Sequence, residues 1–339
     1  MAVSDSRIAA TAAGEGRTSA LSAAIDLAVR YNFIVIFFVV VAIASTLSSN
    51  FLTLANISNL FQQAAVVGVV AVGMTFVILT ANIDLSVGSM VALSGMIVAL
   101  LLSTGVDPFV AVAVTLLVGV AGGALMGGIS AYAQVPSFIV TLAGLVSFRG
   151  ITYLISEGTP IGNLPKGFGA LGSTMVPILP GVDFPLMGII FVVVCLIAGL
   201  VLRATVFGEY VYATGGNAEA ARLSGLPTRL MTTAVFAVSG LMAALGGIML
   251  TSRLRIGQPT AAQGLELDAI AAVVLGGTSL FGGRGGVLGT FFAVMLLQVL
   301  RNIFNLLGLG SFYQMTVTGV IIVAAILLNR LIDHRMGRG

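Results

Sequence analysis

Long apolar runs recur along the whole chain and constrain its fold more than any other feature. The run Leu186–Leu202, for example, holds 17 consecutive residues without a charge. Because these runs are continuous and do not alternate with polar residues, they predict membrane-spanning helices. Only 8% of the residues are charged, whereas soluble domains usually carry about 25%. The sequence therefore predicts an all-α, polytopic integral membrane protein.

The length of the chain sets the number of spans that we expect. At roughly 20 apolar residues per span, the 339 residues accommodate about ten helices and leave no room for a large soluble domain. We expect an N-terminal segment at 1–30, a transmembrane domain at 31–331 and a tail at 332–339. The predicted spans are 32–49, 56–80, 85–104, 108–133, 137–156, 184–205, 229–252, 266–280, 287–307 and 312–331.

The placement of cations predicts the orientation of these spans. With an even number of spans and a cytoplasmic N-terminus, ten of the 15 Lys and Arg residues lie on the cytoplasmic side. Cytoplasmic loops of membrane proteins carry an excess of Lys and Arg. Both termini, and the polar loop 206–228, are therefore predicted to be cytoplasmic. The net charge of +3 is interpreted as this asymmetry and not as affinity for nucleic acid.

Several kinds of chemistry are absent from the sequence. Cys195 is the one cysteine and His334 the one histidine, so we expect neither a disulfide framework nor a metal site. The only lysine, Lys166, is followed by Gly167, which excludes a nucleotide-binding P-loop. HExxH and GxSxG motifs are also missing. We therefore expect no catalytic residues, no cofactor in this chain and no enzymatic activity.

The stretch Gly208–Pro227 is the longest polar interruption between two strongly apolar segments of the second half. Asn217 can cap a helix whose first turn contains Glu219, near the positive end of the helix dipole. Gly225 supplies a left-handed stop, and Pro227 prevents continuation. Such a helix has about two turns and is marginal in water on its own. We therefore expect a partner surface to order it.

Two Gly-containing polar segments interrupt apolar runs, at Thr80–Ser89 and at Leu275–Thr290. Irregular backbone at membrane depth is tolerated only where protein buries it or a water-filled cavity borders it. The similar settings of the two segments suggest a degenerate internal repeat, as in many transporters. Asp84 either caps the helix that follows, accepting from the amide of Ser86 or Val87, or contacts a transported solute. Asn82 and Ser86 carry the same two interpretations.

Other polar or small residues within the apolar runs allow further predictions. Gln62 and Gln63 must hydrogen-bond another helix or border a wet lumen. Glu266 and Asp268 occupy the first turn of a predicted helix, which the helix dipole favours, and Arg253 and Arg255 are close enough in sequence to neutralise them. The small-residue stripes Gly119, Gly123, Gly127 and Ser239, Ala243, Gly247 predict close helix packing.

Four sequence strings indicate a family. EAARLSG (Glu219–Gly225) fits the EAA-x3-G pattern of the loop on which the ATPase docks in many bacterial ABC importer permeases. The other strings are GMTFVILTANIDLSVGS (Gly73–Ser89), YATGGNAEAARLSG (Tyr212–Gly225) and ELDAIAAVVLGGTSLFGGRGGVLGT (Glu266–Thr290). With them the chain, from about Tyr31 to Asn329, resembles the permease subunit of ribose-type and xylose-type sugar ABC importers. Its branched-chain amino-acid relatives share these motifs.

The resemblance implies the partners and the site residues. It implies a permease dimer, expected to be a homodimer, in the bacterial inner membrane. Two ATPase subunits that bind ATP and Mg²⁺ would lie beneath it, and a periplasmic sugar-binding protein above. A monosaccharide, pentose or hexose, would be imported. The expected ATPase-docking residues are Glu219, Ala220, Ala221, Arg222 and Gly225; the expected translocation-pathway residues are Gln62, Asn82, Asp84, Ser86, Thr278 and Ser279. The chain lacks the downstream Ile-x-Leu-Pro of maltose-type importers, so that architecture is not transferred.

Three alternatives remain open from the sequence. An ABC permease for branched-chain amino acids or another small polar solute could carry related breaks. An ion-coupled secondary transporter is suggested by Asp84, Glu266 and the apparent repeat. A passive channel would draw only on the Gly-rich breaks. ATP dependence and gradient dependence of uptake separate the three.

Overall fold

The computed structural model describes residues 32–310 except 180–181, with a few isolated positions up to 320. The predicted N-terminal segment, most of the last predicted span and the tail lie outside these residues. The long helices are α2 (Asn32–Leu47), α3 (Leu54–Leu79), α4 (Val87–Ser103), α5 (Pro108–Ala133), α6 (Ser137–Ser156), α8 (Leu186–Ala204), α11 (Thr228–Leu254) and α13 (Val287–Leu306). The shorter ones are η1 (Lys166–Gly169), α7 (Ala170–Ser173), α9 (Val206–Gly216), α10 (Ala218–Leu223) and α12 (Leu265–Leu275).

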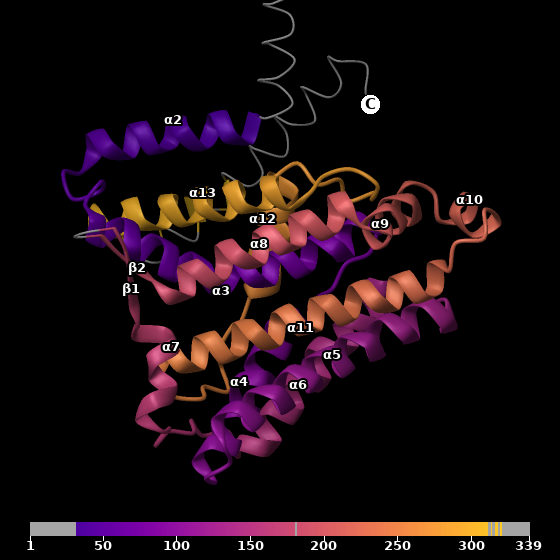
Figure 1. Ribbon diagram of the computed structural model, residues 1–339, viewed down its shortest axis with the longest axis horizontal. Helices are drawn as coiled ribbons and strands as arrows, with labels where there is room; N and C mark the ends of the chain where they lie inside the picture. The colour runs from indigo at the N-terminus through magenta and orange to yellow at the C-terminus, as the bar shows by residue number, and fades with distance from the viewer. Residues whose placement is uncertain (1–31, 180–181, 311–312, 314–315, 318, 321–339) are drawn as a thin grey trace, which may run out of the picture.

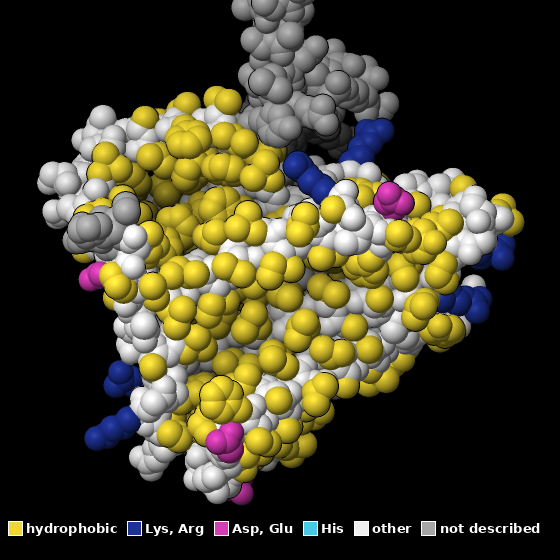
Figure 2. Space-filling view, viewed as in Figure 1, with side chains coloured by type: hydrophobic (Ala, Val, Ile, Leu, Met, Phe, Trp, Pro, Cys, Tyr) yellow, Lys and Arg dark blue, Asp and Glu magenta, His cyan; other side chains and the backbone are white. Residues whose placement is uncertain are grey.

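The all-helical, multi-span prediction is confirmed. Nine of the ten predicted segments coincide with a helix in the described part of the chain, and six of these helices are long and apolar enough to cross a membrane. The helices α2 and α4 are apolar but shorter, and α12 has only 11 residues. Hydrophobic side chains cover most of the face between the two ends of the molecule (Figure 2).

One end of the molecule is marked by α10, and the opposite end by α7 and a small hairpin (Figure 1). The hairpin pairs β1 (Met175–Leu179) with β2 (Val182–Pro185) in antiparallel register. It lies in the proline-rich segment between α7 and α8. The side chain of Ser58, on α3, donates to the Asp183 carbonyl oxygen at 3.0 Å and so joins the hairpin to the bundle.

Helix α3 forms the centre of the core. Almost every side chain from Ala64 to Leu79 is buried, and α8, α11, α12 and α13 all pack against this helix. Three polar pairs join α3 to α13: Asn56 and Asn302 exchange two hydrogen bonds, Gln298 donates to Gln63, and Thr75 bonds Thr290. Because polar groups inside a membrane protein need partners, these pairs fix the register of the two helices.

The predicted glycine packing is confirmed for α5. A Cβ on Gly119 or Gly123 would overlap backbone of Gly240 or Phe236 on α11, so the two backbones are nearly in contact. A Cβ on Gly247, in the second stripe, would overlap the Val91 carbonyl oxygen on α4. Such stripes let helices pack where the hydrophobic effect gives no advantage over lipid.

Helices α4 and α12 begin inside the bundle, each after a long helix and an irregular segment. Helix α4 follows α3 through 80–86, and α12 follows α11 through 255–264. The second segment runs along α4, since Gly257 lies beside Ala99 and the Ala262 carbonyl oxygen lies beside Gly88. A Cβ on Gly88 would overlap the Glu266 carboxylate, so the N-terminal ends of α4 and α12 meet. The structural counterpart of the first break is therefore 255–264, and not the predicted Leu275–Thr290, which is a turn between α12 and α13.

Candidate functional site

Helix α10 projects from one end of the molecule (Figure 1). The Asn217 Oδ1 atom accepts from the Ala220 amide at 2.9 Å, so Asn217 caps the helix as predicted. Gly225 has a φ of 87°, which is the predicted left-handed stop. Ala221 is buried against the protein, whereas Glu219, Ala220 and Arg222 are exposed. Ala221 thus anchors the short helix to the rest of the protein, and the exposed residues of the helix face away from it.

The two charged residues of α10 pair with each other. Two nitrogens of Arg222 donate to the two carboxylate oxygens of Glu219 at 2.7 and 3.0 Å. These hydrogen bonds hold the pKa of Glu219 below its ordinary value, so the carboxylate is charged at neutral pH. Both side chains are more than half exposed, and such pairs contribute little to stability. The pair is therefore available to a partner.

Helix α9 precedes α10 and occupies Val206–Gly216, which the sequence predicts as part of a polar loop. Thr205 caps it by accepting from the Gly208 amide at 3.3 Å. A Ser or Thr before a helix start is a recognisable signal, but the Gly-rich composition concealed it. The predicted loop 206–228 therefore contains two helices joined at Asn217.

The C-terminal end of α9 joins the two breaks. The Gly283 amide donates to the Leu79 carbonyl oxygen at 2.9 Å, and a Cβ on Gly215 would overlap that same oxygen. Tyr212, one turn earlier, donates its hydroxyl to the Gly285 carbonyl oxygen at 2.9 Å. We call Leu79, Gly215 and Gly283 the three-way junction. It brings together the motifs that the sequence singled out separately.

Asp84 lies buried in the first break with an exposed fraction of 1%. One oxygen accepts from the amide and the hydroxyl of Ser86, at 3.0 and 2.6 Å, and the other accepts from the Ser239 hydroxyl on α11 at 2.8 Å. The predicted bond to the Ser86 amide is present. Helix α4 itself begins one residue after Ser86, so Asp84 organises the turn before the helix and attaches it to α11.

The remaining groups of the first break also have partners. Asn82, half-buried, donates to the Thr80 carbonyl oxygen at 2.8 Å. The Ile83 amide donates to the Ser137 hydroxyl, and its carbonyl oxygen accepts from Thr141, both on α6. Side chains of α6 thus satisfy the hydrogen-bonding groups of this irregular backbone. Irregular backbone at membrane depth requires such burial by protein.

The polar residues of the second break build a turn. The Thr278 hydroxyl, buried, accepts from the Gly286 amide at 3.3 Å, and the Ser279 hydroxyl accepts from the Phe281 amide at 3.2 Å. Gly277, Gly282 and Gly283 all have positive φ, which a glycine tolerates. Helix α12 therefore ends at Leu275, five residues before the predicted end.

The glutamine and acid predictions have mixed outcomes. Gln62 donates to the Gly172 carbonyl oxygen at 2.6 Å and Gln63 accepts from Gln298, so both bond to another element. Asp268 pairs with Arg301 of α13 at 2.6 Å. Arg253 and Arg255, which the sequence offers as partners of Glu266 and Asp268, pair with neither among the described residues. Both lie beside η1 and α7, against Gly172 and Gly169. The pairing of Asp268 with Arg301 joins two neighbouring helices, α12 and α13, so closeness in sequence did not predict it.

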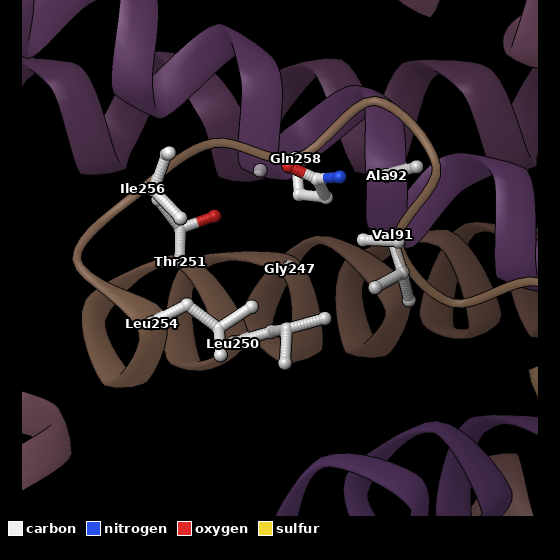
Figure 3. Close-up of a pocket in the computed structure, with 10 residues that line it drawn as sticks. Val91, Ala92, Gly247, Leu250, Thr251, Leu254, Ile256 and Gln258 are labelled. Atoms are coloured by element: carbon white, nitrogen blue, oxygen red, sulfur yellow. The ribbon is translucent and has the colours of Figure 1, made fainter. Parts of the chain in front are cut away.

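Two small cavities lie among the described residues near the breaks and the α3–α13 contact. One lies between α4, α11 and the 255–264 segment, where Gln258 faces Val91 and Leu250 (Figure 3). The other lies between α3, α12 and α13 beside Asp268 and Arg301. Each has about 10 Å³ for the centre of a water molecule, enough for about one water. Neither could enclose a sugar in this conformation.

Comparisons with known proteins place the chain in a family. The profile of the family described as branched-chain amino acid transport system / permease component matches residues 56–326. The ribose import permease protein RbsC of Escherichia coli (strain K12) is 45% identical over 86% of this chain and 90% of its own length. RbsC of Bacillus subtilis (strain 168) is 43% identical over the same shares.

A more distant relative shows how far the similarity extends. The xylose transport system permease protein XylH of Escherichia coli (strain K12) is 34% identical over 86% of this chain and 88% of its own length. No solved structure matches the chain. The profile match over most of the chain and these identities show that the chain belongs to the family of branched-chain amino acid transport system / permease components.

Proposed function

We propose that this chain is the membrane permease of an ATP-driven importer that moves a monosaccharide, a pentose or a hexose, into the cytoplasm. Relatives that import ribose, allose and xylose support the sugar. The observation that carries the transport mechanism is the exposed, internally capped helix α10, which the three-way junction connects to both breaks. The chain is a transport subunit and not an enzyme.

The ATP-hydrolysing partner is proposed to dock on α10. Glu219, Ala220, Arg222 and Gly225 are exposed, and the buried Ala221 anchors the helix to the protein. A helix of six residues is marginal in water without contacts; α9 and α11 supply some of these, and the ATPase would supply the rest. ATP and Mg²⁺ would be bound by that partner, and a periplasmic binding protein would deliver the sugar to the opposite end.

Orientation and assembly follow from the same argument. If α10 is cytoplasmic, so are Arg203, Arg229 and Arg284, whose segments adjoin it, as the excess of cations on the cytoplasmic side requires. Both termini are then cytoplasmic if α2, α4, α12 and the segment 312–331 complete about ten spans. A second copy of the chain would complete a homodimer around the transport pathway.

The pathway is proposed to border the two breaks. Asn82 is the partly exposed polar residue of the first break and would contact the solute, whereas Asp84, Ser86 and Thr278 hold the irregular backbone in place. Gln62 and Ser279 complete the proposed set. Neutral hydroxyls and amides suit a neutral sugar, which needs no fixed countercharge.

Reconstitution tests the proposal and its alternatives. Proteoliposomes that contain this chain with its ATPase and binding protein are expected to import the monosaccharide only when ATP is present inside. Vesicles with the permease alone are expected to be inert. Uptake driven by an ion gradient without the ATPase would instead identify a secondary transporter. Because the family also includes branched-chain amino-acid permeases, import of leucine but not of any sugar would identify that alternative.

Reversing the charge of Glu219 is expected to uncouple transport. Glu219→Lys removes the pair with Arg222 and places two cations three residues apart, which costs the helix only about 0.2–0.5 kcal/mol. The permease should therefore fold normally but bind its ATPase weakly, and sugar uptake should fall several-fold. Co-purification of the ATPase and ATP-dependent uptake measure the two effects.

Glu209→Lys is the matched control. Glu209 is exposed in the first turn of α9 and undergoes the same change of charge, but it lies outside α10. It is expected to keep both ATPase binding and uptake. Normal binding and normal uptake in Glu219→Lys would show that α10 is not the docking element.

A further inference from the structure

A polar cluster on the outer face of α3, α12 and α13 has no assigned role. It consists of Gln63 on α3, Asp268 on α12, and Gln298 and Arg301 on α13. The ion pair joins Arg301 to one oxygen of Asp268 at 2.6 Å, and Gln298 donates to the Gln63 carbonyl oxygen at 3.0 Å. We call these four residues the outer polar cluster.

The outer polar cluster is partly exposed on the protein surface, although it lies between the two ends of the membrane-spanning helices. The side chains of Asp268 and Arg301 are 32% and 31% exposed, and Gln63 is exposed while Gln298 is buried. Gln63 lies about 13 Å along α3, whose length of about 39 Å exceeds the hydrocarbon core. Asp268 belongs to the first turn of the helix that begins inside the bundle. The cluster is therefore at membrane depth.

The cluster also has unused hydrogen-bonding capacity. Within the described part of the chain, the second oxygen of Asp268, the amide nitrogen of Gln63 and the remaining N–H groups of Arg301 have no hydrogen-bond partner in the protein. A small cavity with room for about one water lies between Asp268, Gln298 and Arg301. A partly exposed ion pair with unused donors is costly against lipid. Water or a polar solute would satisfy these groups.

We propose that the outer polar cluster borders the aqueous transport pathway and contacts the passing monosaccharide, an inference that rests on the proposed function. A sugar hydroxyl both donates and accepts, so the Asp268 oxygen can accept from it while the Arg301 and Gln63 N–H groups donate to it. Because the ion pair and the Gln63–Gln298 bond are already formed, the sugar replaces water and not protein partners. The contact is therefore weak, as a pathway that must release its solute requires.

Cysteine accessibility tests the proposal in the full complex of permease, ATPase and binding protein in vesicles. In a Cys195→Ala background, Gln63→Cys is compared with Leu196→Cys. Leu196 lies about midway along α8 and is 68% exposed, but its surroundings are apolar. The probe is the membrane-impermeant methanethiosulfonate ethylsulfonate, which reacts with the thiolate, a form that requires water. We expect Gln63→Cys to react at least about tenfold faster.

Equal and slow reaction at the two positions would overturn the proposal. That result would mean that lipid, a second copy of the chain or the segment 312–331 covers the cluster. Uptake by the wild-type complex in the same vesicles tests the proposed function separately. If wild type imports no monosaccharide while Gln63→Cys reacts rapidly, the proposed sugar fails and the aqueous position of the cluster stands.

A transport measurement separates a pathway role from a structural one. Gln63→Leu keeps a similar volume and removes the amide. We expect it to lower sugar uptake several-fold while ATP hydrolysis stimulated by the binding protein stays within about twofold of wild type. A parallel loss of uptake, hydrolysis and complex assembly would show that Gln63 only holds α3 to α13, and it would overturn the proposal.

Discussion

Gly215→Ala is expected to abolish sugar uptake and to destabilise the permease. The added Cβ would overlap the Leu79 carbonyl oxygen and crowd the Gly283 amide. That oxygen already accepts from the Gly283 amide at 2.9 Å, so the backbone cannot retreat without breaking the bond between the breaks. Overpacking of this kind costs about 1–3 kcal/mol, and occasionally more. Here the displaced groups are backbone and not the flexible end of a side chain.

The next residue provides the control for this prediction. Nothing lies within 4 Å of a Cβ on Gly216, and Gly216 is also in α9. Gly216→Ala should be neutral or should stabilise α9 by up to about 1 kcal/mol, since alanine loses less backbone entropy. Thermal unfolding of the purified permease and ATP-dependent uptake in vesicles measure the two effects. Equal behaviour of the two variants would show that close packing at the three-way junction is not needed.

The junction also explains how a movement at α10 would reach the membrane. Tyr212 holds α9 to the second break through the Gly285 carbonyl oxygen, and Asn217 is shared as the C-cap of α9 and the N-cap of α10. If the proposed ATPase displaces α10, the displacement would therefore act directly on Leu79 and Gly283. We expect Tyr212→Phe, which removes only the hydroxyl, to weaken coupling far less than Gly215→Ala.

Local features were predictable from the sequence because they depend on a few adjacent residues. The cap at Asn217, the stop at Gly225 and the bond from the Ser86 amide to Asp84 each involve residues at most three positions apart. Apolar runs likewise predicted the positions of nine helices in the described part of the chain, of which six are long and apolar enough to cross a membrane. The family resemblance was confirmed by the comparisons.

Features that depend on residues far apart could not be predicted in this way. The pairs of Asp84 with Ser239 and of Asp268 with Arg301 join residues 155 and 33 positions apart. No pattern within one segment distinguishes Arg301 from Arg253 as the partner of Asp268. The start of α12 inside the bundle depends on 255–264 packing along α4, which hydropathy does not report. The sequence also did not show that Leu275–Thr290 forms a turn between two helices, because glycines are typical both of breaks within a helix and of turns.

Substitutions at Asp84 are expected to separate a structural carboxylate from one that carries charge in transport. Asp84→Ala would leave the buried Ser86 amide and Ser239 hydroxyl without acceptors, at a cost of about 1–3 kcal/mol for each group. The permease should lose thermal stability and uptake together. Ser239→Ala removes one donor and leaves the Ser86 bonds intact, so its effect should be smaller.

Asp84→Asn keeps nearly the same shape and is expected to be tolerated. Its amide oxygen can still accept from Ser86, and its amide nitrogen can donate to Ser239, whose hydroxyl can turn to a backbone carbonyl oxygen one turn earlier in α11. If Asp84 has only a structural role, no transport step needs a charge at this position. Uptake by the full complex should therefore stay within a few-fold of wild type. Stable Asp84→Asn protein that no longer imports the sugar would show the opposite. It would assign the carboxylate to ion coupling or to solute contact, and it would exclude a purely structural role for Asp84 in the turn before α4.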